Sequence, residues 1–195
     1  MIKYKDQRVG VFVDVANMYH SAKNLYSARV NFKEVLRTAV DNRKLIRAIA
    51  YVIRSESDEE KAFFGALDKQ GFEVKAKDLQ IFPGGAKKAD WDVGIAMDAI
   101  KLADRLDSVI LVSGDGDYVP LVTYLQENKG CQVEIIAFGK TTSSRLINAS
   151  DDFIDLGQDT KRYLIQGHDQ GAIKKLFPGK IRRLAGGQQP NNLNN

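Results

Sequence analysis

Short apolar runs alternate with segments of helical periodicity along most of the chain, and this alternation constrains the fold more than any other feature. The expected strands are 8–14, 45–53, 72–82, 108–113, 132–138 and an edge strand at 153–156. The expected helices are 17–28, 32–41, 56–70, 91–106, 118–128 and 143–149. Strands separated by helices of about ten residues connect by right-handed crossovers into a parallel sheet with helices on both faces. The sequence therefore predicts an α/β fold.

The charge of the chain is unevenly distributed. The 195 residues carry a net charge of +4. Residues 161–195 contain seven Lys or Arg and one acid, Asp169, a net charge of +6, so residues 1–160 carry −2. We expect residues 1–160 to form the domain and residues 161–195 to be a basic, partly disordered C-terminal extension. A basic segment on a slightly acidic body suggests a polyanion partner, although it could equally serve only to keep the protein in solution.

Cysteine content and hydropathy exclude several classes of protein. Cys131 is the only cysteine, so no internal disulfide is possible, and we expect it to be a buried small hydrophobe. No segment approaches the roughly 18 consecutive apolar residues of a membrane-spanning helix. The charged N-terminus does not resemble a signal peptide, which favours the cytoplasm and no membrane partner. The sequence is also compatible with a homo-oligomer.

Acidic residues follow three of the predicted strands. Asp14 ends the first strand, with Asn17 three residues later. The segment 113–117 (SGDGD) follows the fourth strand. Asp90-Trp91-Asp92 follows the third strand across a glycine-rich loop, and Asp98 lies further along the next helix. Because ligands of open parallel sheets bind beyond the carboxyl ends of the strands, we expect these acids to converge there.

Crowded carboxylates repel one another unless a cation lies between them. All the candidate ligands are oxygen donors, and neither His20 nor His168 belongs to the group. Oxygen ligation favours Mg²⁺, Mn²⁺ or Ca²⁺ over Zn²⁺. Mg²⁺ is the usual ion of phosphate chemistry, where it activates water and stabilises charge on the phosphate. We therefore expect Mg²⁺ or Mn²⁺ at this site.

Some of these residues also have purely structural interpretations. Asp90 is interpreted as a helix cap. Asp115 and Asp117 would, alone, be read as turn residues. Asp98 is expected either at the rim of the cluster or paired with a lysine. Trp91 is interpreted as a packing residue.

His20 is interpreted as a surface or helix-packing histidine. Asp14 has the weakest structural explanation, because an acid that ends so apolar a strand needs a cation or a metal ion.

Two segments near the acids could bind phosphate. Lys87 and Lys88 are expected in the glycine-rich loop that begins at Pro83, where they could contact phosphates or be a solvated pair. The segment 141–145 (TTSSR) opens the last predicted helix. Its members Thr142, Ser143 and Arg145 are the candidates for substrate binding. The alternative for this segment is ordinary helix N-capping.

Three motifs resemble those of the NYN domains, and more closely the LabA-like subgroup of the PIN-like nuclease superfamily. The motifs are Phe12–Asn17, Lys88–Ile95 with Asp98, and Leu111–Asp117. The resemblance covers roughly Arg8 to Leu156. It implies a PIN-like three-layer α/β/α sandwich and metal-dependent hydrolysis of RNA, single-stranded or structured.

The resemblance also implies roles for individual residues. It assigns the catalytic and metal-binding acids to Asp14, Asp92, Asp115 and Asp117, with Asn17, Asp98 and Ser113 in support. It thus points to an endoribonuclease that uses Mg²⁺ or Mn²⁺.

Two other functions remain as alternatives. One is an RNA- or protein-binding module that keeps the fold and does not cut. The other is a haloacid-dehalogenase-like phosphatase, which would have a second Asp where this chain has Ala16. A Rossmann dinucleotide protein is unlike this chain, because Val15-Ala16-Asn17 replaces the glycine-rich turn.

Overall fold

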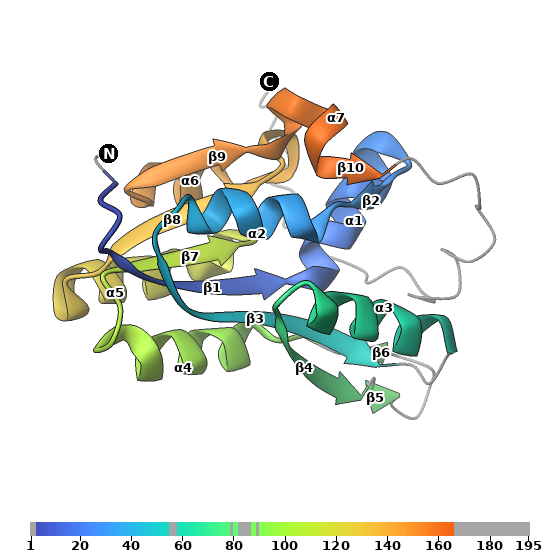
Figure 1. Cartoon of the computed structure of the whole chain (residues 1–195), viewed down its shortest axis with the longest axis horizontal. Coiled ribbons are helices and arrows are strands. Elements are labelled where there is room, and N and C mark those ends of the chain that lie inside the picture. The colour runs from blue at the N-terminus through green and yellow to red at the C-terminus, as the bar shows by residue number, and fades with distance from the viewer. Residues whose placement is uncertain (1–2, 55–57, 79, 82–86, 89, 166–195) are drawn as a thin grey trace, which may run out of the picture.

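A six-stranded parallel sheet forms the centre of the molecule (Figure 1). The computed structural model describes residues 3–54, 58–78, 80–81, 87–88 and 90–165. The order of the strands across the sheet is β4-β3-β1-β7-β8-β9, and every neighbouring pair is parallel. The strands are β1 (Arg8–Asp14), β3 (Lys44–Arg54), β4 (Glu73–Asp78), β7 (Ser108–Val112), β8 (Gln132–Ala137) and β9 (Asp152–Asp155). The predicted α/β fold with a parallel central sheet is confirmed.

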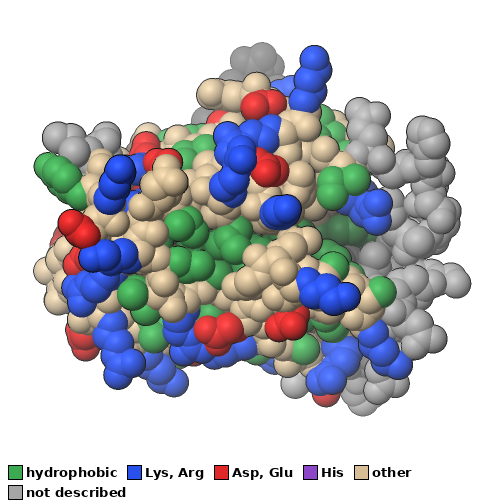
Figure 2. Space-filling model, viewed as in Figure 1, with side chains coloured by type: hydrophobic (Ala, Val, Ile, Leu, Met, Phe, Trp, Pro, Cys, Tyr) green, Lys and Arg blue, Asp and Glu red, His purple; other side chains and the backbone are tan. Residues whose placement is uncertain are grey.

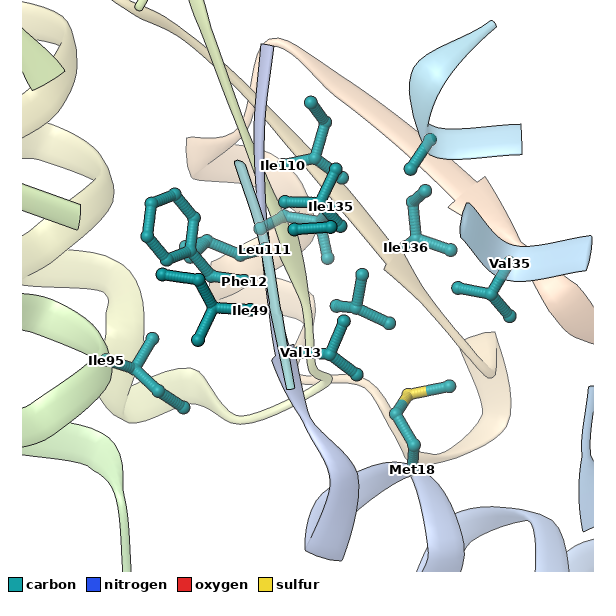
Figure 3. Packing of buried hydrophobic residues seen from close by; sticks show 14 of the residues in the cluster. Phe12, Val13, Met18, Val35, Ile49, Ile95, Ile110, Leu111, Ile135 and Ile136 are labelled. Carbon is teal, nitrogen blue, oxygen red and sulfur yellow. The ribbon is translucent and has the colours of Figure 1, made fainter. Parts of the chain in front are cut away.

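Helices cover both faces of this sheet. They are α1 (Val15–Tyr26), α2 (Phe32–Val40), α3 (Asp58–Lys69), α4 (Asp92–Ala103), α5 (Val119–Lys129) and α6 (Ser144–Ala149). Neighbouring residues of a strand point to opposite faces. Accordingly, Phe12 lies on the face covered by Ile95 of α4, and Val13 lies on the face covered by Met18 of α1 and Val35 of α2 (Figure 3). The result is the three-layer arrangement that the sequence predicts.

The surface on the side of α2 and α3 shows hydrophobic side chains between the helices, with Lys and Arg side chains around them (Figure 2). Cys131 is 4% exposed, as expected for a small core residue. In the described ranges, no helix combines the length and the apolar character needed to cross a lipid bilayer.

The third predicted strand and the loop after it differ from the prediction. The strand expected at 72–82 ends in the main sheet at Asp78. Beyond it, β5 (Gln80–Ile81) pairs antiparallel with β6 (Lys87–Lys88). The prediction of a loop at Lys87 and Lys88 was therefore wrong. A run of strand-forming residues does not reveal that the chain changes its pairing partner within the run.

Two more short strands escaped prediction, β2 (Arg29–Val30) and β10 (Leu164–Ile165), which pair antiparallel. Between β9 and β10 lie η3 (Leu156–Asp159) and α7 (Thr160–Tyr163). The Tyr163 side chain is buried, and its hydroxyl lies 3.0 Å from Oγ1 of Thr38. The described chain thus continues through α7 and β10 to Ile165.

The start of α4 depends on a close contact between Gly94 and Trp91. The Trp91 Nε1 group donates to the carbonyl of Val52 at 2.8 Å, and its ring packs on Tyr51 with centroids 5.2 Å apart. A Cβ atom added at Gly94 would lie 2.5 Å from Cε3 of Trp91. The absence of a side chain at residue 94 thus lets the indole anchor the first turn of α4. Trp91 is confirmed as a packing residue.

This contact predicts opposite effects of two glycine substitutions in helices. Gly94→Ala should destabilise the fold by about 1–3 kcal/mol, because the indole must move. Gly65→Ala is the matched control in α3, since a Cβ there meets nothing within 4 Å. It should stabilise by about 0.5–1 kcal/mol through helix propensity. Thermal melts of both variants check this, and equal shifts in the same direction would contradict the packing argument.

Candidate active site

Asp14 lies where β1 changes directly into α1. It is the last residue of the strand and the N-cap of the helix, and its carboxylate accepts a hydrogen bond from the backbone N–H of Asn17 at 3.0 Å. The side chain is partly buried. Because no loop separates the two elements, the carboxylate is held at the carboxyl end of a central strand.

The loop after β7 is tied to the same place. The side-chain oxygen of Asn17 accepts a hydrogen bond from the backbone N–H of Gly114 at 3.0 Å. Ser113 is buried, and its hydroxyl oxygen accepts from the N–H of Asp115 at 3.3 Å. Asp115 in turn caps η1 (Gly116–Tyr118) by accepting from the N–H of Asp117 at 3.1 Å. The predicted supporting residues Asn17 and Ser113 therefore fix the backbone around the acids.

Asp92 comes from a third element, the first residue of α4. One of its oxygens, Oδ1, accepts a hydrogen bond from the hydroxyl of Tyr118 at 3.1 Å. The N-cap of α4 is Trp91. Asp90, interpreted from the sequence as the cap, is exposed and lies one residue before it, so that interpretation placed the cap one residue too early.

Asp14, Asp92 and Asp115 lie close enough together for their charges to affect the pKa values of Asp14 and Asp92. Burial raises the pKa of Asp14 to about 7, the negative charges of Asp92 and Asp115 add to this rise, and backbone N–H groups partly oppose it. Burial also raises the pKa of Asp92, the Tyr118 hydroxyl opposes this, and the charges of Asp115, Asp90 and Asp117 add to the rise. The site is therefore an electrostatically crowded group of acids.

The donor chemistry of these acids fits an open magnesium-type site. Within the described ranges, no three His, Cys, Asp or Glu side chains are placed so that together they could hold one metal ion. A closed cage is therefore not preformed. Mg²⁺ in phosphate chemistry needs only one or two carboxylates, with waters and substrate as its other ligands. The carboxylate oxygens of Asp14, Asp92 and Asp115 suit that kind of coordination.

Asp98 lies outside this group and forms an ion pair, one of the two alternatives considered from the sequence. Its Oδ2 atom accepts from the ammonium of Lys75 at 2.6 Å and from the hydroxyl of Tyr51 at 2.8 Å. Burial alone would raise the pKa of Asp98, but these two donors outweigh it and lower the pKa. His20 packs edge-on against Tyr19, with ring centroids 5.3 Å apart, as expected for a helix-packing histidine.

A shallow depression lies beside Asp115 and Asp117. Its volume is about 640 Å³, and it is lined by residues 114–117 and 140–143. Thr142 and Ser143, predicted to bind substrate, thus lie next to the acidic loop. Ser143 occupies the N-cap position of α6 but forms no capping hydrogen bond with its side chain. The N-capping interpretation is therefore correct for the position of Ser143, but its hydroxyl does not form the capping hydrogen bond.

Comparisons with known proteins agree with this geometry. Residues 8–157 match the model of the NYN domain. The chain belongs to the NYN domain family. It is 24% identical over 161 residues to the low amplitude and bright protein LabA of Synechococcus elongatus, covering 78% of this chain and 86% of that protein. It also resembles the crystal structure of a protein of unknown function from Vibrio parahaemolyticus, with 32% identity and a TM-score of 0.76, covering 85% of this chain and all of the other.

These matches confirm the NYN assignment and its LabA-like character, and they place this NYN domain in the PIN-like nuclease superfamily. Two residues beside the acids were not identified from the sequence, Tyr118 and Lys140. Tyr118 directly follows Asp117, so its position in the acidic motif was the available signal. Lys140 had none, because it lies between the predicted strand at 132–138 and the segment 141–145 and belongs to no motif.

The raised pKa of Asp14 predicts that Asp14→Asn stabilises the metal-free protein by an amount that depends on pH. Below about pH 4 the carboxyl is protonated in both folded and unfolded chains. As the pH rises from 3.8, its ordinary pKa, to about 7, the folded chain retains a proton that the unfolded chain releases, so stability falls. The variant lacks this loss, while its amide can still cap α1. In denaturation experiments in EDTA, the free energy of unfolding of the variant should exceed that of the wild-type protein by about 2–3 kcal/mol more at pH 8 than at pH 5. A gain independent of pH would contradict the assignment.

Proposed function

We propose that this NYN domain is a metal-dependent ribonuclease that hydrolyses phosphodiester bonds of RNA with Mg²⁺ or Mn²⁺. The observation that carries the proposal is the partly buried Asp14, whose pKa is raised by burial and by neighbouring acids. A protein that keeps such a group at the carboxyl end of its central strand needs a cation there to offset the charge. Membership of the PIN-like superfamily supports the same chemistry.

We assign the roles of the acids from their positions. Asp14 and Asp115 hold the ion, because each is fixed at a helix start by a backbone hydrogen bond to its own carboxylate. Asp92 and Asp117 position water or a second ion. The bound ion would supply an activated water and stabilise charge on the phosphate. Tyr118 orients Asp92 through the hydrogen bond to its Oδ1 atom.

The proposal predicts a selective loss of activity in Asp14→Asn. The variant should fold, because shape and helix capping are kept. Its Mn²⁺-dependent cleavage of a fluorescent single-stranded RNA should fall by at least about a hundredfold, because the ion loses a principal ligand. Asp104→Asn is the control: Asp104 is exposed and pairs with Lys129 on the surface. Undiminished cleavage by Asp14→Asn would refute the assignment, and binding without cleavage by the wild-type protein would favour a non-catalytic module.

We also propose that residues beyond Ile165 strengthen RNA binding without taking part in cleavage. Residues 166–195 contain five Lys or Arg and one acid. If three or four of these cations contact phosphates, removing residues 166–195 should reduce the salt dependence of binding by about two to three log–log units. Turnover at saturating RNA should change little, because the acids lie between Asp14 and Asp117. An unchanged affinity and salt slope in the folded truncation would refute this role.

A further inference from the structure

Three polar side chains beside the acids, those of Lys140, Ser143 and Arg145, have no partner for their polar atoms among the described residues. Lys140 and Arg145 are exposed, and in the part of the chain that the structure describes neither forms an ion pair. In the same part of the chain, the hydroxyl of Ser143 forms no hydrogen bond. We call these three residues the basic wall. Together they offer an ammonium, a guanidinium and a hydroxyl, the donors that bind phosphate oxygens.

Basic side chains at the opposite edge of the sheet are already engaged. Lys75 pairs with Asp98, and Arg54 pairs with Asp78. Lys77 lies over the ring of Trp91, 5.8 Å from its centroid. Within the part of the chain that the structure describes, Lys140 and Arg145 of the basic wall differ from these three residues in forming neither an ion pair nor a ring contact, and they lie on the side of β8 and α6. This asymmetry indicates on which side of the acids an anionic ligand extends.

The backbone beneath the basic wall is held firmly. In η2 (Gly139–Thr141), the N–H of Gly139 donates to Oδ1 of Asp155 at 2.8 Å. The hydroxyl of Thr141 lies 3.0 Å from that of Ser21, and the hydroxyl of Thr142 donates to the carbonyl of Phe138 at 2.9 Å. The backbone of Lys140 therefore belongs to a fixed turn. Because the backbone is already ordered, less conformational entropy is lost when Lys140 binds an anion.

Two glycines bring the basic wall against the acidic loop. A Cβ atom at Gly116 would lie 2.7 Å from Oγ of Ser143 and 3.9 Å from a guanidinium nitrogen of Arg145. A Cβ at Gly114 would lie 2.9 Å from Oγ1 of Thr142. The N–H of Ser143 also donates to the carbonyl of Gly114 at 3.0 Å. Residues with side chains at 114 and 116 would separate the two loops.

We propose that the basic wall binds a phosphate of the RNA strand next to the phosphate that is cut. The acids attract the ion and repel every phosphate not in contact with it, so the neighbouring phosphate needs compensation close by. Lys140, Ser143 and Arg145 provide it on one side of Asp115 and Asp117. The inference rests on the proposed ribonuclease function and adds a binding requirement: a substrate needs at least one phosphate beyond the scissile one on that side.

The test compares two double variants of equal charge. One is Lys140→Gln with Arg145→Gln. The other, a control, is Arg29→Gln with Lys33→Gln, which removes two exposed cations near the far end of α1 that form no ion pair among the described residues. Binding of a single-stranded oligoribonucleotide is measured by fluorescence anisotropy over a range of salt, with Ca²⁺ in place of Mg²⁺ to suppress cleavage. Ser143→Ala is a milder third variant.

The wall variant should bind at least about tenfold more weakly, and its log–log salt slope should be about 1.4 units smaller, since each contact contributes about 0.7. The control should retain the wild-type slope. A dinucleotide with a single phosphodiester should bind the wild-type and wall variants equally, because it has no second phosphate. If the wild-type protein binds RNA and both double variants weaken equally, the subsite is refuted while the ribonuclease proposal stands. If the wild-type protein binds no RNA, both are refuted.

Discussion

The pairing of β1 with β7 is the constraint on which the site depends. These parallel strands pair from Val9 with Ser108 through Val13 with Val112, so their carboxyl ends lie side by side in the middle of the sheet. The chain leaves β1 through Asp14 and leaves β7 through the loop that carries Asp115. The hydrogen bond between the side chain of Asn17 and the N–H of Gly114 then joins the segments that follow these two strands. Acids about a hundred residues apart in sequence become neighbours because of this pairing.

The fully buried Glu134 and the partly buried Asp14 lie in opposite electrostatic surroundings. Glu134 is fully buried, yet Arg43, Ser108 and Lys3 donate to it and lower its pKa against the effect of burial. The negative charge of Glu134 is therefore balanced by donors within the fold. Burial raises the pKa of Asp14, and the negative charges of Asp92 and Asp115 add to that rise. An uncompensated buried charge is costly to a fold, which is why we interpret Asp14 as the ligand of a cation.

Much of the fold could be predicted from the sequence because periodicity is a local signal. Each main-sheet strand and each major helix follows from apolar spacing, and parallel pairing places Asp14 and Asp115 at one edge. Contacts that depend on side-chain direction could not be predicted. Asp98 lies six residues after Asp92 on the same helix, and only the structure shows that it pairs with Lys75. Among the described residues, the ammonium of Lys140 and the hydroxyl of Ser143 have no partner, and this too depends on their surroundings, which no sequence pattern displays.

We propose above all that the acids at the end of β1, in the loop after β7 and at the start of α4 hold a divalent cation. Crystals soaked in Mn²⁺ and measured for anomalous scattering test it most directly. The account predicts an anomalous peak within about 2.0–2.6 Å of an oxygen of Asp14 and of at least one of Asp92 and Asp115. A well-ordered site with no peak, or carboxylates of Asp14 and Asp115 more than about 10 Å apart, would contradict it, because no single ion could then bridge them.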